Sequence, residues 1–155
     1  MRVRPKIGDV IEIRTSKGLA YALYTHRHPM MGPLLRVLEG EYAERPPDLS
    51  EVVSKGVRFS TFFPLGAAVR RDLVSIAGNV PVPEELKEFP TFRAAGLENP
   101  KTGKVDVWWL WDGEREWKVG KLTREQRKLP IQSIVNDTML IHWIGSGWRP
   151  ETDRR

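Results

Sequence analysis

Alternating apolar and polar residues predict β-structure at the start of the chain. Residues 9–14 alternate in this way, with Ile11 and Ile13 on one face, and a Ser-Lys-Gly turn separates them from a second extended run at residues 19–27. The second run has apolar side chains on both faces, which is typical of a central strand that is covered twice. A third strand is predicted over residues 34–38, so the hairpin gains one further strand.

The middle of the chain alternates between short helices and one strand. Asp48 is a good helix N-cap with Glu51 three positions on, and Gly56 is placed to end a helix of about two turns. A strand is then predicted over residues 57–63 and a short helix over residues 66–73. Residues 78–83 are expected to be irregular, and a short helix begins at the end of this stretch, where a proline precedes two glutamates.

The last third predicts a three-stranded meander followed by a helix. The strands are expected at residues 92–98, 105–111 and 115–121, and Asp-Gly at the second connection is a strong hairpin signal. Thr123 caps a short polar helix that ends before a proline. Asn136 or Asp137 caps a final helix that runs to Ser146.

These elements favour an α+β fold over an α/β fold, because the strands form two groups with helices between and after them. We expect a mostly antiparallel, twisted sheet of two strand groups, about six to eight strands in all, with short helices and a C-terminal helix. The chain has 155 residues, the size of one domain. We assign residues 1–150 to a single globular domain and residues 151–155 to a polar C-terminal tail.

Composition narrows the class of protein. Hydrophobic residues make up 40% and charged residues 29%, which are ordinary globular values. There is no cysteine, so disulfides and thiolate zinc sites are excluded. No apolar run approaches the roughly 20 residues of a membrane helix, and the basic N-terminus leads into a polar strand pattern instead of an apolar signal core. The sequence therefore predicts no membrane association and a cytoplasmic location.

Histidines are the first candidates for chemistry. His26 and His28 leave the same face of a predicted strand end, where they can hold a metal ion if His142 or a carboxylate completes the set. The alternative is that they are polar residues at a sheet edge or a partner surface. Neither a second ligand motif nor a paired carboxylate for acid–base catalysis follows from the spacing, and Gly-Ser-Gly around Ser146 lacks the context of a nucleophile elbow. We expect no catalytic residue, no metal and no cofactor.

Tryptophan is the most distinctive residue of the chain, and four of the six lie in one predicted hairpin. Trp108 and Trp109 must point to opposite faces of their strand. Trp111 is expected to pack on the core, whereas Trp108 lies on the face that a helix or a partner covers. Aromatic rings can stack on single-stranded nucleic acid, but the same hairpin is rich in aspartate and glutamate, which counts against that role.

Two segments carry a resemblance to a known family. Residues 6–13, Lys-Ile-Gly-Asp-Val-Ile-Glu-Ile, and the strand Ala-Tyr-Ala-Leu-Tyr at residues 20–24 resemble the opening of family twenty-six of the bacterial immunity proteins. Leu-Pro-Ile at residues 129–131 and Asn-Asp at residues 136–137 look like the closing region of that family. The resemblance implies a cytoplasmic, non-enzymatic inhibitor of a cognate secreted toxin, and it supplies no functional residues to transfer.

The leading hypothesis is an immunity protein that binds and neutralises a toxin domain by stoichiometric occlusion. Since the net charge is +5, the contacted face of the toxin is expected to be acidic or neutral. A small basic nucleic-acid-binding module is the alternative, and a His-dependent enzyme is the third hypothesis. No pattern specifies an oligomeric state. Candidate partner contacts are polar or aromatic residues near strand ends: Tyr24, His26, Arg27, His28, Trp108, Arg115 and Lys118.

Overall fold

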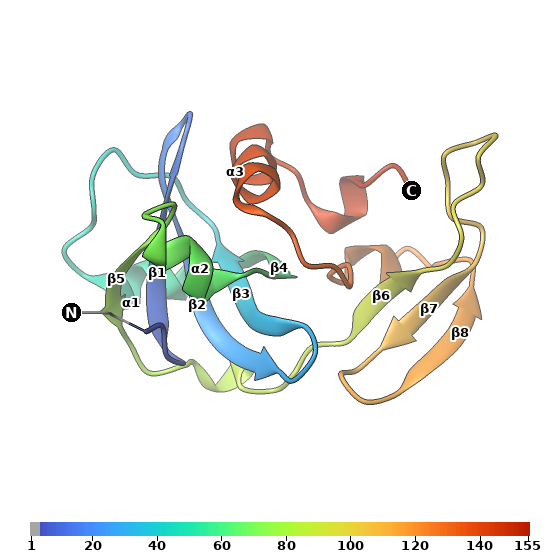
Figure 1. Ribbon diagram of the computed structural model, residues 1–155, viewed down its shortest axis with the longest axis horizontal. Coiled ribbons are helices and arrows are strands. Elements are labelled where there is room, and N and C mark those ends of the chain that lie inside the picture. The colour runs from blue at the N-terminus through green and yellow to red at the C-terminus, as the bar shows by residue number, and fades with distance from the viewer. Residues whose placement is uncertain (1–3) are drawn as a thin grey trace.

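A five-stranded antiparallel sheet and a three-stranded antiparallel sheet lie side by side in the computed structural model, which describes residues 4–155 (Figure 1). The large sheet has the order β4-β3-β2-β1-β5 and consists of β1 (Asp9–Thr15), β2 (Gly18–His28), β3 (Gly32–Leu38), β4 (Val57–Phe62) and β5 (Ser75–Asn79). The small sheet has the order β6-β7-β8 and consists of β6 (Phe92–Ala95), β7 (Trp108–Trp111) and β8 (Glu116–Gly120). The helices are α1 (Leu49–Ser54), α2 (Leu65–Arg70) and α3 (Asp137–Ser146), with 3-10 turns η1 (Glu84–Leu86), η2 (Gln126–Lys128) and η3 (Pro150–Thr152). The predicted α+β fold with a C-terminal helix is confirmed.

Capping residues fix the helix ends where the sequence predicted them. The Asp48 side chain accepts a hydrogen bond from the backbone N–H of Ser50 at the start of α1. At the start of α3, the Asn136 side chain accepts one from Met139, and Gly147 ends the helix in the left-handed conformation with φ of 77°.

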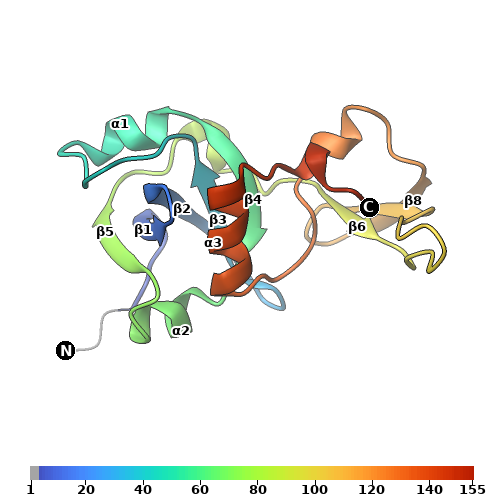
Figure 2. The ribbon, with the colours of Figure 1, turned by 90° about the horizontal axis from the view of Figure 1, so that it is seen from above.

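Helices cover both faces of the large sheet (Figure 2). On one face, Leu65 of α2 and Leu140 and Ile144 of α3 pack against the inward side chains of β1 to β4. On the other face, Val52 and Val53 of α1 complete a second cluster. This double cover accounts for the apolar residues on both faces of β2.

An aromatic cluster joins the two sheets. Phe62 of β4 and Phe92 of β6 stack with ring centroids 5.1 Å apart, and Leu34 and Trp111 belong to the same buried cluster. Phe89 is packed against it from the segment that leads into β6. The small sheet therefore shares its hydrophobic core with the large one.

Trp108 does not lie at the surface, so its selection as a partner contact is wrong. Its ring is 2% exposed and is buried with Leu110 and Leu122. The guanidinium of Arg93 lies 4.7 Å from the centroid of this ring. Burial of Arg93 lowers the pKa of its guanidinium to about 10, and its Nε and Nη2 have no hydrogen-bond partner among the described residues. The face of β7 that carries Trp108 was predicted to be covered by a helix or a partner, and in the structure other parts of the chain cover it.

Residues 151–155, assigned by the sequence to a polar tail, contact the loop before β7 and the segment after β8. The carbonyl of Arg155 accepts a hydrogen bond from the backbone N–H of Val105, and Arg127 donates to the carbonyl of Asp153. These contacts hold the end of the chain in place.

One strand was missed. β5 pairs antiparallel with β1 at the edge of the large sheet, in a segment for which the sequence predicted no strand and whose last two residues fall in the predicted irregular stretch. The residues of β5 are half-buried or exposed and do not alternate, because the strand contains Gly78 and has a neighbour on one side only. No helix among residues 4–155 combines the length and apolar character needed to cross a membrane.

Candidate functional site

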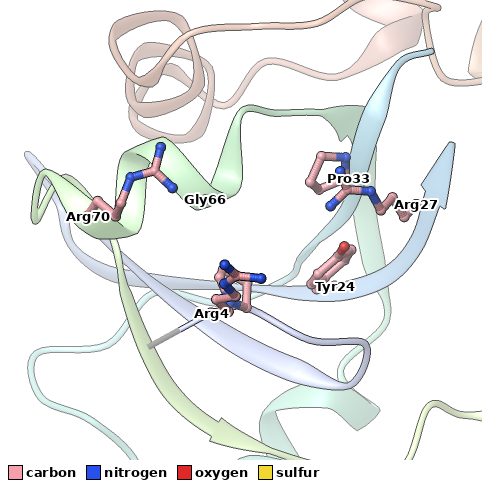
Figure 3. Close-up of a pocket in the computed structure, with 7 residues that line it drawn as sticks. Arg4, Tyr24, Arg27, Pro33, Gly66 and Arg70 are labelled. Atoms are coloured by element: carbon pink, nitrogen blue, oxygen red, sulfur yellow. The ribbon is translucent and has the colours of Figure 1, made fainter. Parts of the chain in front are cut away.

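Three arginines surround one concavity on the face of the large sheet that carries α2. We call it the arginine pocket; its volume is about 260 Å³. Arg4 lies before β1, Arg27 near the end of β2 and Arg70 at the end of α2, and Figure 3 shows their side chains around the same opening with Tyr24 between them. The lining residues are Arg4, Pro5, Tyr24, Arg27, Pro33, Gly66 and Arg70.

An irregularity in β2 brings Tyr24 and Arg27 to the same pocket. Residues three positions apart point to opposite faces of a regular strand. The pairing of β2 with β3 shifts its register between Tyr24 and His26, which is the signature of a β-bulge. The extra residue reverses the alternation, so Arg27 comes to the side of the sheet on which Tyr24 packs.

The positive charges of the pocket have no counter-charge within the described chain. The side chains of Arg4, Arg27 and Arg70 are exposed, and none makes an ion pair or a side-chain hydrogen bond with residues 4–155. The lining contains no carboxylate. Guanidinium groups stay protonated in proteins and can only donate hydrogen bonds, so the pocket presents several unused cationic donors.

Tyr24 and Gly66 shape the floor and one side of the pocket. Tyr24 is only 4% exposed and belongs to the core cluster under α2 and α3, so its ring is held in place. Its hydroxyl makes no hydrogen bond with the described residues and can donate to a ligand. A Cβ added to Gly66 would stand 3.5 Å from Nη1 of Arg70, which shows that the Arg70 side chain folds back across this glycine.

A second arginine-lined concavity lies at the C-terminal end of α3, and we call it the helix-end concavity. It is lined by Glu39, Gly40, Glu41, Arg58, Gly147 and Arg149. Arg58 donates hydrogen bonds to the carbonyl oxygens of Ile144, Trp143 and Trp148, at 3.0, 2.9 and 3.3 Å. Arg149 pairs with Glu39 at 2.7 Å. Both arginines of this concavity are used inside the molecule.

His26 helps to join the two sheets. Its Nε2 lies 2.8 Å from the carbonyl oxygen of Lys87, and since a carbonyl only accepts, Nε2 carries the proton. Nδ1 then accepts from the hydroxyl of Thr25 at 2.8 Å, and that hydroxyl accepts from Nε of the buried Arg36. Burial lowers the pKa of His26, the nearby charge of Arg36 lowers it further, and the Lys87 carbonyl acts in the opposite direction.

His28 makes the corresponding connection to the turn between β7 and β8. Its Nε2 donates to the carbonyl oxygen of Gly113 at 2.9 Å, and its Nδ1 accepts from the backbone N–H groups of Met30 and Met31. The ring centroid lies 4.9 Å from that of Trp111. All four ring nitrogens of the two histidines are therefore engaged by the fold. We call this region, with Thr25 and Arg36, the sheet junction.

Candidate catalytic and metal-ligating side chains do not gather in the arginine pocket. The lining of the arginine pocket contains no carboxylate, histidine, serine or threonine, which are the usual bases and nucleophiles. His142 lies on α3 in a different surface concavity, away from the lining that His26 and His28 share. Among residues 4–155, no three His, Asp or Glu side chains are grouped to hold a metal ion.

The seven residues selected from the sequence fall into separate regions. Tyr24 and Arg27 meet in the arginine pocket, and Arg27 also lines a neighbouring concavity with His26 and His28. Trp108 is buried. Arg115 and Lys118 are exposed at the β7–β8 turn and on β8, and neither lines the arginine pocket.

Sequence reasoning missed Arg4 and Arg70. Arg70 begins an Arg-Arg pair, but nothing in the sequence indicates that it faces Arg27. Arg4 precedes the first strand in a short basic segment that has no periodicity. Their grouping depends on tertiary structure alone.

No protein-family model matches this chain, and comparisons with curated proteins and with solved structures find no match either.

Proposed function

We propose that this protein is an immunity protein that binds a cognate bacterial toxin domain and neutralises it by stoichiometric occlusion. The observation that carries the proposal is the arginine pocket, in which three exposed arginines have no counter-charge within the described chain. Such a cluster attracts an acidic surface and increases the rate of encounter with it. In this proposal the protein acts in the cytoplasm and catalyses no reaction.

The chemistry of the site fits a protein partner. Arginine is enriched among residues that contribute most to interface energy, because its planar fork pairs with carboxylates in two hydrogen bonds. An inhibitor of standard size buries about 1,600 Å² in total, which extends well beyond the pocket. The partner is expected to place aspartate and glutamate side chains opposite Arg4, Arg27 and Arg70. The resemblance at residues 6–13 and 20–24 supports the same class of protein.

A nucleic-acid-binding module is the second candidate, because the pI is about 9.7 and unpaired arginines also bind phosphates. The neighbouring concavity contains Asp112 and Glu114, which repel a phosphate backbone that follows the surface past Arg27. The hydrogen bonds of His26 and His28 do not support a His-dependent enzyme.

Co-expression with the product of the adjacent gene tests the proposal. The two proteins should co-purify in a 1:1 complex, and growth should be restored in cells that the partner alone arrests. Arg27→Glu with Arg70→Glu should weaken the complex at least about ten-fold. Lys101→Glu with Lys104→Glu is the matched control, because both lysines are exposed in the loop before β7. Absence of a complex, or equal loss in both double variants, would contradict the proposal.

A further inference from the structure

The arginine pocket has the chemistry of a site for a single tetrahedral anion. We propose that it binds the phosphate group of a small phosphomonoester. This inference goes beyond the proposed function, because it concerns the chain by itself and holds whatever protein partner the chain has. It rests on the direction of the donors, on the absence of acidic residues from the lining and on the size of the pocket.

Donors approach the pocket from three separate parts of the fold. Arg4 precedes β1, Arg27 belongs to β2 and Arg70 ends α2, so the guanidinium groups meet the opening from different sides (Figure 3). The hydroxyl of Tyr24 adds a neutral donor from the floor. The oxygen atoms of a tetrahedral anion, which point in several directions, can therefore each accept a hydrogen bond from a different donor.

For a single small ligand of the free chain, charge and shape favour a phosphomonoester over one carboxylate group. A carboxylate has two oxygens in one plane, and one arginine satisfies both of them in a bidentate pair. A phosphomonoester carries about −1.5 to −2 charge at pH 7 and three acceptor oxygens, which require several donors arranged around it. Three guanidinium groups and a hydroxyl match the oxygens of a phosphomonoester, whereas one carboxylate can use only some of these donors.

The size of the pocket favours a small ligand over a polymer. At about 260 Å³ it lies just below the usual range of ligand pockets, about 300–1,000 Å³. It can enclose a phosphate and little more of the molecule that bears it. A nucleic-acid backbone, with one charge per phosphate, needs a groove along which successive phosphates lie.

The walls of the pocket are stiff, which lowers the entropic cost of binding. Pro5 and Pro33 have a fixed backbone angle, and Tyr24 is anchored in the core. Gly66 leaves the space through which Arg70 reaches the opening. Replacing Gly66 by aspartate would put a carboxylate beside the Arg70 guanidinium. This carboxylate would occupy the position of the bound anion.

An NMR titration of the whole chain with inorganic phosphate tests the site, with chloride added to keep the ionic strength constant. We expect saturable one-to-one binding, with the largest amide shifts at Tyr24, Arg27, Gly66 and Arg70. Arg27→Gln and Arg70→Gln should each weaken phosphate binding about ten-fold, and Gly66→Asp should abolish it. Lys101→Gln should leave the dissociation constant unchanged. The spectrum of each free variant shows whether the fold is retained.

Five results would overturn the assignment. Acetate that binds as tightly as phosphate would make the pocket a carboxylate site. A phosphoserine peptide that binds more tightly than free phosphoserine would assign the anion to a partner protein, and a thymidine decamer that does so would assign it to nucleic acid. Shifts that do not saturate, or that the Arg27 and Arg70 variants leave unchanged, would mean an adventitious ion only. Because the titration uses the chain alone, its failure does not affect the co-purification experiment, and the reverse also holds.

Discussion

Arg58 and Arg27 come from strands of the same sheet and line concavities of the same kind, yet they differ in what they bind. Arg58, in the helix-end concavity, donates to three carbonyl oxygens at the end of α3 and after it. Helix ends leave carbonyl groups without a partner in the helix, so Arg58 completes the fold. Arg27, in the arginine pocket, has no such partner among the described residues. An arginine indicates a binding surface only where the fold leaves its donors unused.

The same difference between used and unused donors distinguishes Arg27 from the two histidines that flank it in the sequence. His26 and His28 flank Arg27 on β2, and their ring nitrogens are all hydrogen-bonded across the sheet junction. Loss of these histidines should therefore affect stability, whereas loss of Arg27 should affect binding. Substitutions at the two kinds of position can break or sharpen this distinction.

The largest effect is expected at Arg58. Arg58→Ala leaves three carbonyl oxygens without their cationic donor and should lower the free energy of unfolding by about 2–3 kcal/mol, measured by urea denaturation. Arg27→Ala is the comparison and should change it by less than about 0.5 kcal/mol. Equal losses of unfolding free energy in the two variants would show that the hydrogen bonds of Arg58 do not stabilise the fold more than the exposed Arg27 does.

A smaller loss is expected at Thr25. Thr25→Val keeps the shape but removes the hydroxyl that lies between Arg36 and His26, and it should cost about 1–2 kcal/mol in urea denaturation. Thr138→Val, at an exposed position on α3, is the matched control and should be close to neutral. If the Thr25 variant were as stable as the control, the sheet junction would not depend on this network.

A weaker effect is expected for Arg149, whose ion pair with Glu39 is exposed. The two side chains are 41% and 40% accessible, so water screens their attraction. Arg149→Ala should cost about 0.2–1 kcal/mol, and the difference from the unmodified protein should shrink in about 1 M salt. A loss as large as that of Arg58→Ala, or one that salt leaves unchanged, would contradict this ranking.

The smallest effect is expected from pH. The pKa of His26 is lowered in the folded protein, so the unfolded chain takes up its proton first as the pH falls. The contribution of His26 to stability is therefore complete above the ordinary histidine pKa, about 6.5, and declines as the pH drops below it. Urea denaturation between pH 7.5 and 5.5 should show stability falling with pH, and His26→Gln should flatten this slope. An unchanged slope would place the sensitive group elsewhere.

Much of the fold could be predicted from the sequence because its signals are local. Alternation predicted β1, runs rich in apolar residues predicted β2 to β4, and capping residues such as Asp48 and Asn136 predicted the starts of two helices. The sequence of β5 contains no strand pattern, because this strand is held in the sheet by its pairing with β1 and not by a buried apolar face of its own. Strand geometry predicts that Trp108 and Trp109 point to opposite faces of β7. Which of these faces is buried depends on the packing of residues 122–131 and the C-terminus, which the strand's own sequence does not show.

The candidate site was much less predictable. Tyr24 and Arg27 were selected from the sequence, but strict alternation places them on opposite faces, and only the bulge before His26 brings them together. Arg4 and Arg70 come from distant segments. Whether an arginine is paired is a property of its surroundings in space, which is why Arg58 and Arg27 cannot be distinguished in the sequence.

The central claim is that the arginine pocket contributes charge for binding and almost nothing to folding. The most direct test is the triple variant Arg4→Gln, Arg27→Gln, Arg70→Gln, whose urea denaturation and affinity for the co-purified partner are measured side by side. We predict a free energy of unfolding within about 1 kcal/mol of the unmodified protein and an affinity reduced at least about a hundred-fold. An unchanged affinity together with a loss of stability as large as that of Arg58→Ala would contradict the claim.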